Sequence, residues 1–167
     1  MILDRIDARL LELLQEDGRR TVVELADKVG LSETPCARRI RLLEQAGVIK
    51  GYAAVVDPAR MGLNVLAFVQ VKLERHTDEN IDEFRRELAG IEEVVSCHAT
   101  TGAYDFLLQV AAPDLESLSR FVLKRLMQIF YVRDVHSSIV LETLKEGARL
   151  PIGHLASEPI ARPRTSR

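Results

Sequence analysis

Apolar residues in the first fifty positions recur at three- and four-residue steps, a spacing typical of amphipathic helices. The first series is Leu3, Ile6, Leu10, Leu13 and Leu14. Gly18 interrupts this series, and Thr21 and Glu24 follow with the spacing of a capping box. The pattern therefore predicts a first helix, and then a short second helix that ends at Gly30.

A third helix is expected after Ser32, a good N-cap residue, with Pro35 in its first turn and Gly47 beyond its end. A helical wheel places Cys36, Ile40 and Leu43 on one side and Thr34, Arg38, Arg41 and Gln45 on the other, with Arg39 at the flank. A helix, a short helix, a glycine-containing turn and a longer helix, in this order, indicate a helix-turn-helix motif.

The last helix of such a motif lies in the major groove of DNA, where guanidinium groups bind guanine edges or phosphates. The candidate DNA-binding residues are therefore Ser32, Thr34, Arg38, Arg39 and Arg41. The alternative is a solvated helix face on which these arginines pair with glutamates.

After residue 47 the pattern becomes that of an α+β domain. Residues 48–49 and 52–56 have strand-like composition, and residues 57–63, with Asp57-Pro58 and Met61-Gly62, form an expected hinge. The later elements are expected as strands at 64–73, 94–100, 104–111 and 132–141 and helices at 78–89 and 114–129. The order βαββαβ is that of the ferredoxin-like split unit.

The expected organisation is a helix-turn-helix domain at 1–56, the hinge, a ferredoxin-like domain at 64–150 and a tail at 151–167. The tail lacks apolar periodicity and is predicted to be disordered. Both helices of the ferredoxin-like domain cover the same face of the sheet. The opposite face still carries apolar residues, so at least a homodimer is expected.

Charge is distributed unevenly, although the net charge is only −2. Residues 1–56 carry nine basic and nine acidic side chains, residues 57–147 carry ten and fifteen, and residues 148–167 carry four and one. Contact with nucleic acid must therefore come from one helix rather than from a global positive field.

The sequence gives little support to several other classes of protein. No apolar run approaches the length of a membrane span, and the N-terminus lacks a basic signal-peptide region, so a cytoplasmic protein without membrane contact is expected. Cys36 and Cys97 lack paired spacing, so neither a disulfide framework nor a zinc module is indicated. A phosphate-binding loop, a nucleophile elbow and a dinucleotide fingerprint are also missing, so no enzyme and no cofactor is expected.

Four stretches together resemble the Lrp/AsnC family of transcription regulators: LDRIDARLLELLQEDGR, ELADKVGLSETPCARRIRLLEQAGVIKGY, DPARMGL and TTGAYDFLLQV. The resemblance covers about residues 2–150. It implies a winged or plain helix-turn-helix domain, joined by a hinge to a ferredoxin-like domain that senses amino acids or related metabolites. It also implies dimers that assemble to tetramers or octamers. Two helix-turn-helix units per dimer then predict pseudo-palindromic half-sites on double-stranded DNA.

The resemblance places effector contacts in the turn between the second and third strands and on the last strand. The corresponding residues are Thr100, Thr101, Gly102, Ala103, Tyr104 and Asp105, with His136 and Ser138 opposite. A glycine there lets backbone amides approach a carboxylate, and Asp105 can accept an α-ammonium group. An ordinary β-turn would use the same residue types, because Gly and Asp favour turns.

Two further classes of DNA-binding protein remain open. A metal or redox sensor would need ligands from more than one subunit, because the adjacent Cys97 and His98 point to opposite faces of a strand. An architectural DNA-wrapping protein would have no effector. The effector, the operator and the sign of regulation stay open on sequence alone.

Overall fold

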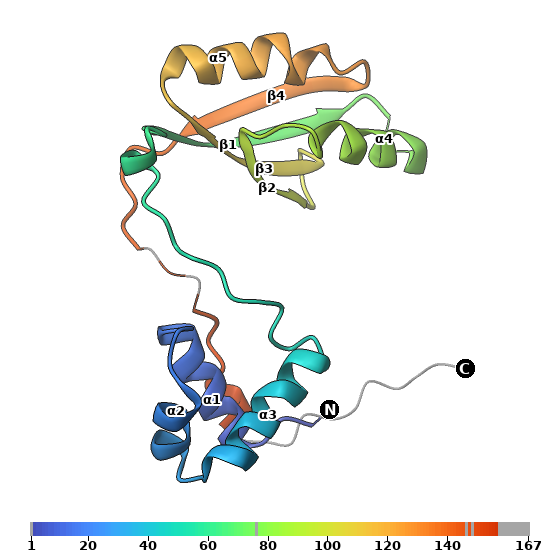
Figure 1. Cartoon of the computed structure of the whole chain (residues 1–167). Helices are drawn as coiled ribbons and strands as arrows, with labels where there is room; N and C mark the ends of the chain where they lie inside the picture. Colours follow the sequence, from blue (N-terminus) through green and yellow to red (C-terminus); the bar gives the residue numbers. More distant parts are fainter. Residues whose placement is uncertain (1, 76, 146, 148, 157–167) are drawn as a thin grey trace, which may run out of the picture. The chain divides into compact units, whose positions relative to one another are not determined.

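The computed structural model describes residues 2–75, 77–145, 147 and 149–156. They form two compact units, shown in Figure 1. The first unit combines the chain up to Val55 with the chain from Lys145 onward, and the second is Val56–Leu144. Residues 145–150 therefore group with the N-terminal unit, whereas the sequence predicted a second domain extending to residue 150.

The first unit contains the expected helices α1 (Arg5–Glu16), α2 (Val22–Val29) and α3 (Glu33–Gln45). The predicted capping box at Thr21 and Glu24 begins α2, and Gly30 ends it in the left-handed conformation. A second capping box, formed by Asp4 and Asp7, begins α1. The helices enclose a small core made of Leu10, Leu13, Leu25, Ala26 and Cys36.

Two local expectations in this unit need correction. Ser32 occupies the N-cap position of α3, but its side chain makes no capping hydrogen bond. Residues 48–56 contain no strand and therefore no wing, and only the short 3-10 helix η1 (Ala59–Met61) precedes the sheet. Strand-like composition is insufficient here because a strand needs a hydrogen-bonded neighbour.

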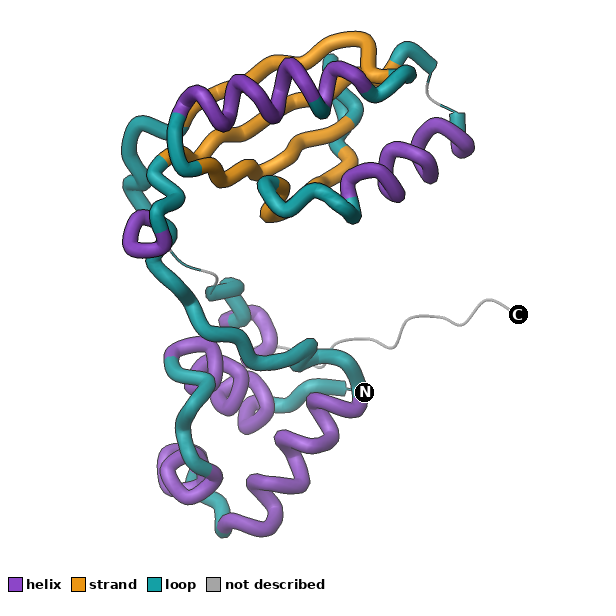
Figure 2. The backbone as a smooth tube through the Cα atoms, turned by 45° about the horizontal axis from the view of Figure 1, so that its top comes forward, coloured by secondary structure: helices purple, strands orange, loops and turns teal. Residues whose placement is uncertain are grey.

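The second unit has the predicted βαββαβ order and is a ferredoxin-like α+β domain. Its strands are β1 (Val65–Leu73), β2 (Val94–Ala99), β3 (Phe106–Ala112) and β4 (Val132–Ile139). They form one antiparallel sheet in the order β2-β3-β1-β4. Helices α4 (Asp78–Leu88) and α5 (Leu115–Lys124) lie on the same face of this sheet (Figure 2).

Burial alternates along the central strands because successive side chains point to opposite faces. Val69 on β1 and Leu108 on β3 are fully buried under the helices, together with Phe84 of α4 and Phe121 of α5. The other side of the sheet, which we call the open face, carries Leu66, Phe68, Gln70, Leu107, Gln109, His136 and Ser138. Phe68 is 40% exposed there, so the open face offers apolar surface to solvent.

Helix α5 ends five residues before the predicted end at 129. The chain leaves the α-helix at Arg125 and continues as the 3-10 helix η2 (Leu126–Gln128). The Arg125 guanidinium donates to both carboxylate oxygens of Glu93, at 3.0 and 2.8 Å, and Leu126 is fully buried. The α-helix therefore ends where these tertiary contacts form, although the apolar spacing alone predicted that it would continue to residue 129.

The beginning of the C-terminal tail has structure that its sequence did not predict. Gly153–Ala156 form the 3-10 turn η3, and Leu155 is only 6% exposed. Disorder was expected for residues 151–167, so for residues 151–156 this expectation is corrected. Residues 157–167 lie outside the described part of the chain.

Candidate functional site

Helix α3 buries one side and exposes the opposite side. Cys36 and Leu43 are fully buried against the other helices, whereas Arg38 and Arg41 are exposed. Ser32 and Thr34, at the start of the helix, are exposed as well. Four of the five candidate DNA-binding residues therefore lie at the surface of α3 or just before it.

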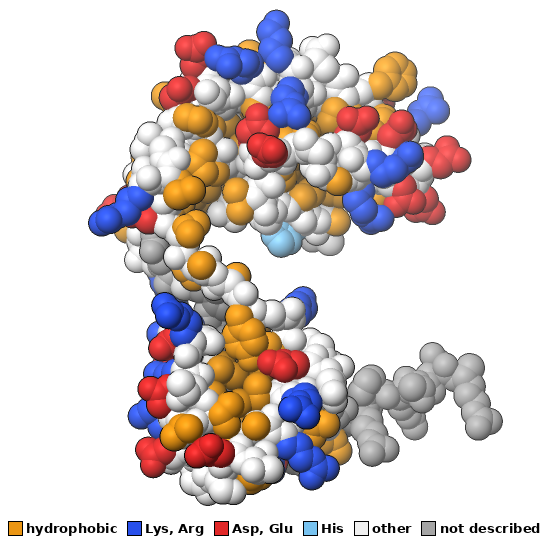
Figure 3. Space-filling view, in the orientation of Figure 1, with side chains coloured by type: hydrophobic (Ala, Val, Ile, Leu, Met, Phe, Trp, Pro, Cys, Tyr) orange, Lys and Arg blue, Asp and Glu red, His pale blue; other side chains and the backbone are white. Residues whose placement is uncertain are grey.

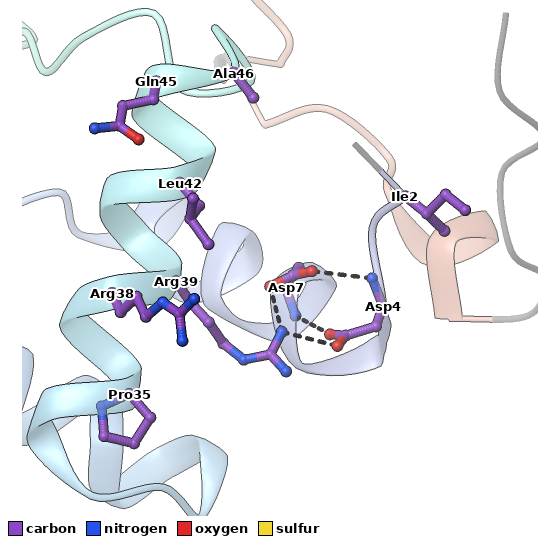
Figure 4. Close-up of a pocket in the computed structure, with 9 residues that line it drawn as sticks. All are labelled: Ile2, Asp4, Asp7, Pro35, Arg38, Arg39, Leu42, Gln45 and Ala46. Carbon is purple, nitrogen blue, oxygen red and sulfur yellow. Dashed lines mark hydrogen bonds and ion pairs between the residues drawn. The ribbon is translucent and has the colours of Figure 1, made fainter.

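Arg39 differs from its neighbours because its guanidinium binds two carboxylates of the α1 N-terminus. Its Nη1 lies 2.8 Å from Asp4 Oδ2 and 2.8 Å from Asp7 Oδ1, as Figure 4 shows. The Asp7 side chain is only 4% exposed. Hydrogen bonds to Asp7 and then Asp4 raise the pKa of Arg39. Arg39 therefore connects the N-terminus of α1 to α3.

The Asp4 carboxylate responds to the same contacts. Desolvation alone would raise the pKa of Asp4, but hydrogen bonds from the Asp7 backbone N–H and the Arg39 side chain outweigh it and lower the pKa. A cavity of about 680 Å³ opens beside this ion pair, and Arg38, Leu42 and Gln45 of α3 line its other wall. The side of α3 next to the ion pair is thus partly apolar.

Charges of both signs are interspersed on the face of each unit seen in Figure 3. This agrees with the equal numbers of basic and acidic side chains in residues 1–56. Positive charge is locally enriched at Arg38 and Arg41, whose guanidinium groups are exposed on one helix.

The turn between β2 and β3 lines a small pocket at the open face of the sheet. Thr100, Thr101, Ala103 and Tyr104 of the predicted effector set lie around a cavity of about 420 Å³, together with Gln70 and Leu107. Gly102 has a φ of 120°, in the region that favours glycine, and it allows the turn to close.

His136 approaches this pocket from β4, whereas Ser138 lies farther along the sheet. Gln70 pairs with Leu107 on one side and with His136 on the other, so these three residues form one row across the open face. The rings of Tyr104 and His136 have centroids 6.3 Å apart. Ser138 pairs with Phe68, one row away from the pocket.

Asp105 has a structural role that the sequence did not indicate. Its Oδ2 accepts a hydrogen bond of 2.7 Å from the backbone N–H of Leu73, next to the irregularity in β1–β4 pairing. Its own backbone N–H donates to Val71, and its carbonyl accepts from Thr100. Asp105 thus holds the start of β3 against β1, and at least part of its carboxylate is engaged in the fold.

Sequence reasoning missed Gln70, Leu107 and Asp134. The hydroxyl of Tyr104 donates to Asp134 Oδ2 at 3.3 Å, which ties the turn to β4. Desolvation, followed by the charge of Asp134, raises the pKa of Tyr104. The alternation of buried and exposed positions in β1 and β3 would have placed Gln70 and Leu107 on the open face. Their shared row depends on strand register.

Two family models match the chain, an AsnC-type helix-turn-helix domain at residues 3–44 and an Lrp/AsnC ligand binding domain at residues 66–150. The chain belongs to the Lrp/AsnC family. It is therefore a transcriptional regulator with a DNA-binding helix-turn-helix domain and a ligand-binding domain, as the resemblance in the sequence predicted.

Lrp/AsnC relatives match this chain over nearly its whole length. The leucine-responsive regulatory protein of Escherichia coli (strain K12) is 37% identical over 150 residues, which cover 90% of this chain and 92% of the relative. A transcriptional regulator from Neisseria meningitidis, solved in complex with L-Met, has a TM-score of 0.87 at 40% identity, over 92% of this chain and 99% of that one. An AsnC family transcriptional regulator from Agrobacterium tumefaciens has a TM-score of 0.85 at 37% identity, over 91% and 99%.

Further observations on this Lrp/AsnC chain concern metal binding and membrane spans. Within the described ranges, no group of three or more His, Cys, Asp or Glu could hold a metal ion. Cys97 pairs with buried Leu108 and His98 with Leu107, so the two side chains point to opposite faces. No helix in the described part of the chain has the length and apolar character needed to span a bilayer.

Proposed function

We propose that α3 reads an operator through Arg38 and Arg41, and that an amino acid bound at the β2–β3 turn controls this binding. The observation that carries the proposal is the pocket at the turn, where Gln70 and Tyr104 place polar groups beside apolar Leu107. A small ligand with both charged and apolar parts suits such a lining.

On the DNA side, Arg38 and Arg41 are the base-reading candidates, and Ser32 and Thr34 are candidates for phosphate contacts. Both arginines are exposed on α3, and guanidinium forks match the acceptors of guanine in the major groove. Arg39 is left out of this set because Asp4 and Asp7 already bind its guanidinium.

On the effector side, the backbone of the turn around Gly102 is the candidate for holding the α-carboxylate. Carboxylates of the β3–β4 region, Asp105 and Asp134, are candidates for the α-ammonium group. The Neisseria meningitidis relative was solved with L-Met, which supports an amino acid as the ligand class. Leu107 would contact the apolar part of its side chain.

The smallest functional assembly is a homodimer formed through the open face of the sheet. Phe68, Leu66 and Leu107 lie on this face, where no helix of the described chain covers them. Burying them against a second copy would remove apolar surface from water. Two α3 helices per dimer then require a pseudo-palindromic operator with half-sites about one helical turn apart.

A thermal-shift screen of the twenty amino acids tests the effector assignment. A true effector at 100 times its dissociation constant adds about 2.7 kcal/mol to the unfolding free energy. Gln70→Ala should abolish this gain, whereas the control Gln109→Ala, on another row of the open face, should retain it. The amino acid that stabilises the protein should also change operator affinity in a gel-shift titration. An architectural protein without an effector would gain no stability with any amino acid.

A further inference from the structure

The chain returns to the first unit after β4 and binds the outside of α1. The backbone N–H of Leu150 donates to Gln15 Oε1 at 2.6 Å, and Gln15 Nε2 donates to the Leu150 carbonyl at 3.5 Å. One side-chain amide thus satisfies both backbone polar groups of Leu150. Such a reciprocal pair fixes the position and direction of the segment at Leu150 on α1. A segment without specific contacts to the helix would form its backbone hydrogen bonds with water instead.

Apolar packing follows a few residues later. The turn η3 packs against α1, and Leu155 is 6% exposed, although it belongs to a segment rich in small residues and prolines. The Leu155 N–H donates to the Ile152 carbonyl at 2.9 Å, which closes the turn and presents the leucine. Polar and apolar contacts therefore act together on the same helix.

The other connection to the first unit is anchored at the same end of α1. The Tyr52 hydroxyl donates to Glu44 Oε1 at 3.0 Å, and its ring lies so near Gly18 that a Cβ there would be 3.2 Å from Tyr52 Cδ1. A cavity of about 800 Å³ is lined by Gly18 and Tyr52 together with Gly147 and Arg149 of the returning chain. Both connections thus meet beside the C-terminal end of α1.

We propose that residues 149–156 are a clasp, an element of the DNA-binding unit that docks on α1 of the same chain. The ligand-binding family model extends to residue 150, so the clasp begins where that match ends. Leu150 lies eleven positions after Ile139 at the end of β4, and Val65 lies thirteen positions after Tyr52. Their maximum spans are similar, about 40 and 45 Å, so the clasp adds a second tether comparable in reach to the first.

Residues 140–148 connect strand β4 to the clasp, and through the clasp to helix α1. His136 lies on β4, so a ligand that shifts this strand acts on the DNA-binding unit through the clasp as well as through the first connection. This consequence rests on the proposed function, whereas docking of the clasp does not. The experiments below therefore measure docking alone, without an effector or DNA.

Chemical crosslinking tests where the clasp binds. Gln15→Cys and Leu150→Cys are combined in the full chain, with Cys97→Ser to remove the exposed native thiol; Cys36 is buried and stays. A short bifunctional thiol reagent should join the two positions within one chain, which denaturing electrophoresis with peptide mapping detects. The matched control pairs Leu150→Cys with Lys28→Cys, an exposed position on α2, and should give no intrachain product. Products only between chains, or none, would overturn the proposal.

Hydrogen exchange supplies a second measurement that leaves Gln15 in place. Leu155→Asp in the full chain should speed exchange of α1 amides about tenfold or more, because a buried leucine changes a local opening equilibrium by about that factor. Leu144→Asp, at a leucine that is 87% exposed, is the control and should leave α1 unchanged. Equal exchange of α1 in both variants and the wild type would show that the clasp does not hold this helix.

Discussion

At the scale of single residues, Arg38 and Arg39 have different environments although they are adjacent. Successive helical residues are about 100° apart, so one step along α3 moves a side chain to another part of the helix surface. Arg38 stays exposed, whereas Arg39 reaches Asp7, a carboxylate that is only 4% exposed. The same residue type is thus exposed in one case, where we propose that it reads DNA, and connects two helices in the other.

Alanine at each position should separate these roles. Arg39→Ala leaves the buried Asp7 carboxylate without its cation and should cost about 1–3 kcal/mol of unfolding free energy. Arg38→Ala should change the unfolding free energy by less than about 0.5 kcal/mol, yet weaken operator binding by about 1–3 kcal/mol. Denaturant titration and gel-shift assays measure the two quantities, and a stability loss confined to Arg38→Ala would contradict the assignment.

Acid should weaken the joint between α1 and α3. The folded-state pKa of Asp4 lies below its ordinary value of 3.8, so the stabilising contribution of Asp4 is complete well above that pH and is lost as pH falls through the lower folded value. Asp4→Asn keeps an N-cap residue but removes the charge that Arg39 binds. The stability difference between wild type and Asp4→Asn should therefore be constant above about pH 5 and shrink below about pH 4. Urea titrations from pH 3 to 6 measure it, and a difference independent of pH would refute it.

At the scale of elements, the β2–β3 turn combines a candidate ligand site with a structural anchor. Thr100, Thr101, Ala103 and Tyr104 line the pocket, while Asp105 at the end of the same turn accepts from the Leu73 N–H. Asp105, the last residue of the turn, therefore positions the turn against β1. Any test of the ligand site at Asp105 must first separate these two roles.

Asp105→Ala and Asp105→Asn should differ in stability. The alanine variant leaves the Leu73 N–H without its acceptor and should lose about 1–3 kcal/mol of sensing-domain stability. The asparagine variant keeps an oxygen that can accept this bond, so its loss should be smaller. If Asp105 also holds an α-ammonium group, loss of the charge in Asp105→Asn should be sufficient to abolish the thermal shift caused by the effector. An Asn variant with an unchanged effector response would make Asp105 a fold residue only.

At the scale of the whole molecule, the sheet has helices on one face and apolar side chains on both. Helices α4 and α5 cover the side of Val69 and Leu108, and Phe68 on the opposite side is 40% exposed. An exposed apolar sheet face is a common site of association between subunits. Assembly is therefore expected to depend on the open face.

Phe68→Asp in the full chain should produce a monomer. The aspartate would place an unpaired charge in the apolar contact between two copies, and such burial is costly. Leu123→Asp is the matched control, because Leu123 is 52% exposed but lies on α5, on the covered side of the sheet. Light scattering should show a mass of one chain for Phe68→Asp and of at least two for the control; a dimeric Phe68→Asp protein would place the interface elsewhere.

Local signals in the sequence were enough to predict most elements of this chain. Three-to-four spacing, the capping box at Thr21 and Glu24 and the glycine after α2 depend on residues within one or two turns of each other. The βαββαβ order and the family also followed from stretches of the sequence, since each stretch carries its own periodicity or motif. The exposure of Ser32, Thr34, Arg38 and Arg41 was also predictable, because it depends on positions within or next to a single helix.

Only the tertiary structure decided the roles that depend on residues far apart in the chain. Arg39 binds Asp4 and Asp7, and Asp105 binds Leu73, across separations of about thirty residues. The contribution of Gln70 to the pocket depends on strand register, which a single strand does not reveal. The strand-like residues 52–56 remain without a strand partner in the described chain, and the weakly apolar tail packs through Leu155. In each case the outcome depends on a partner, and local propensity does not encode where that partner lies.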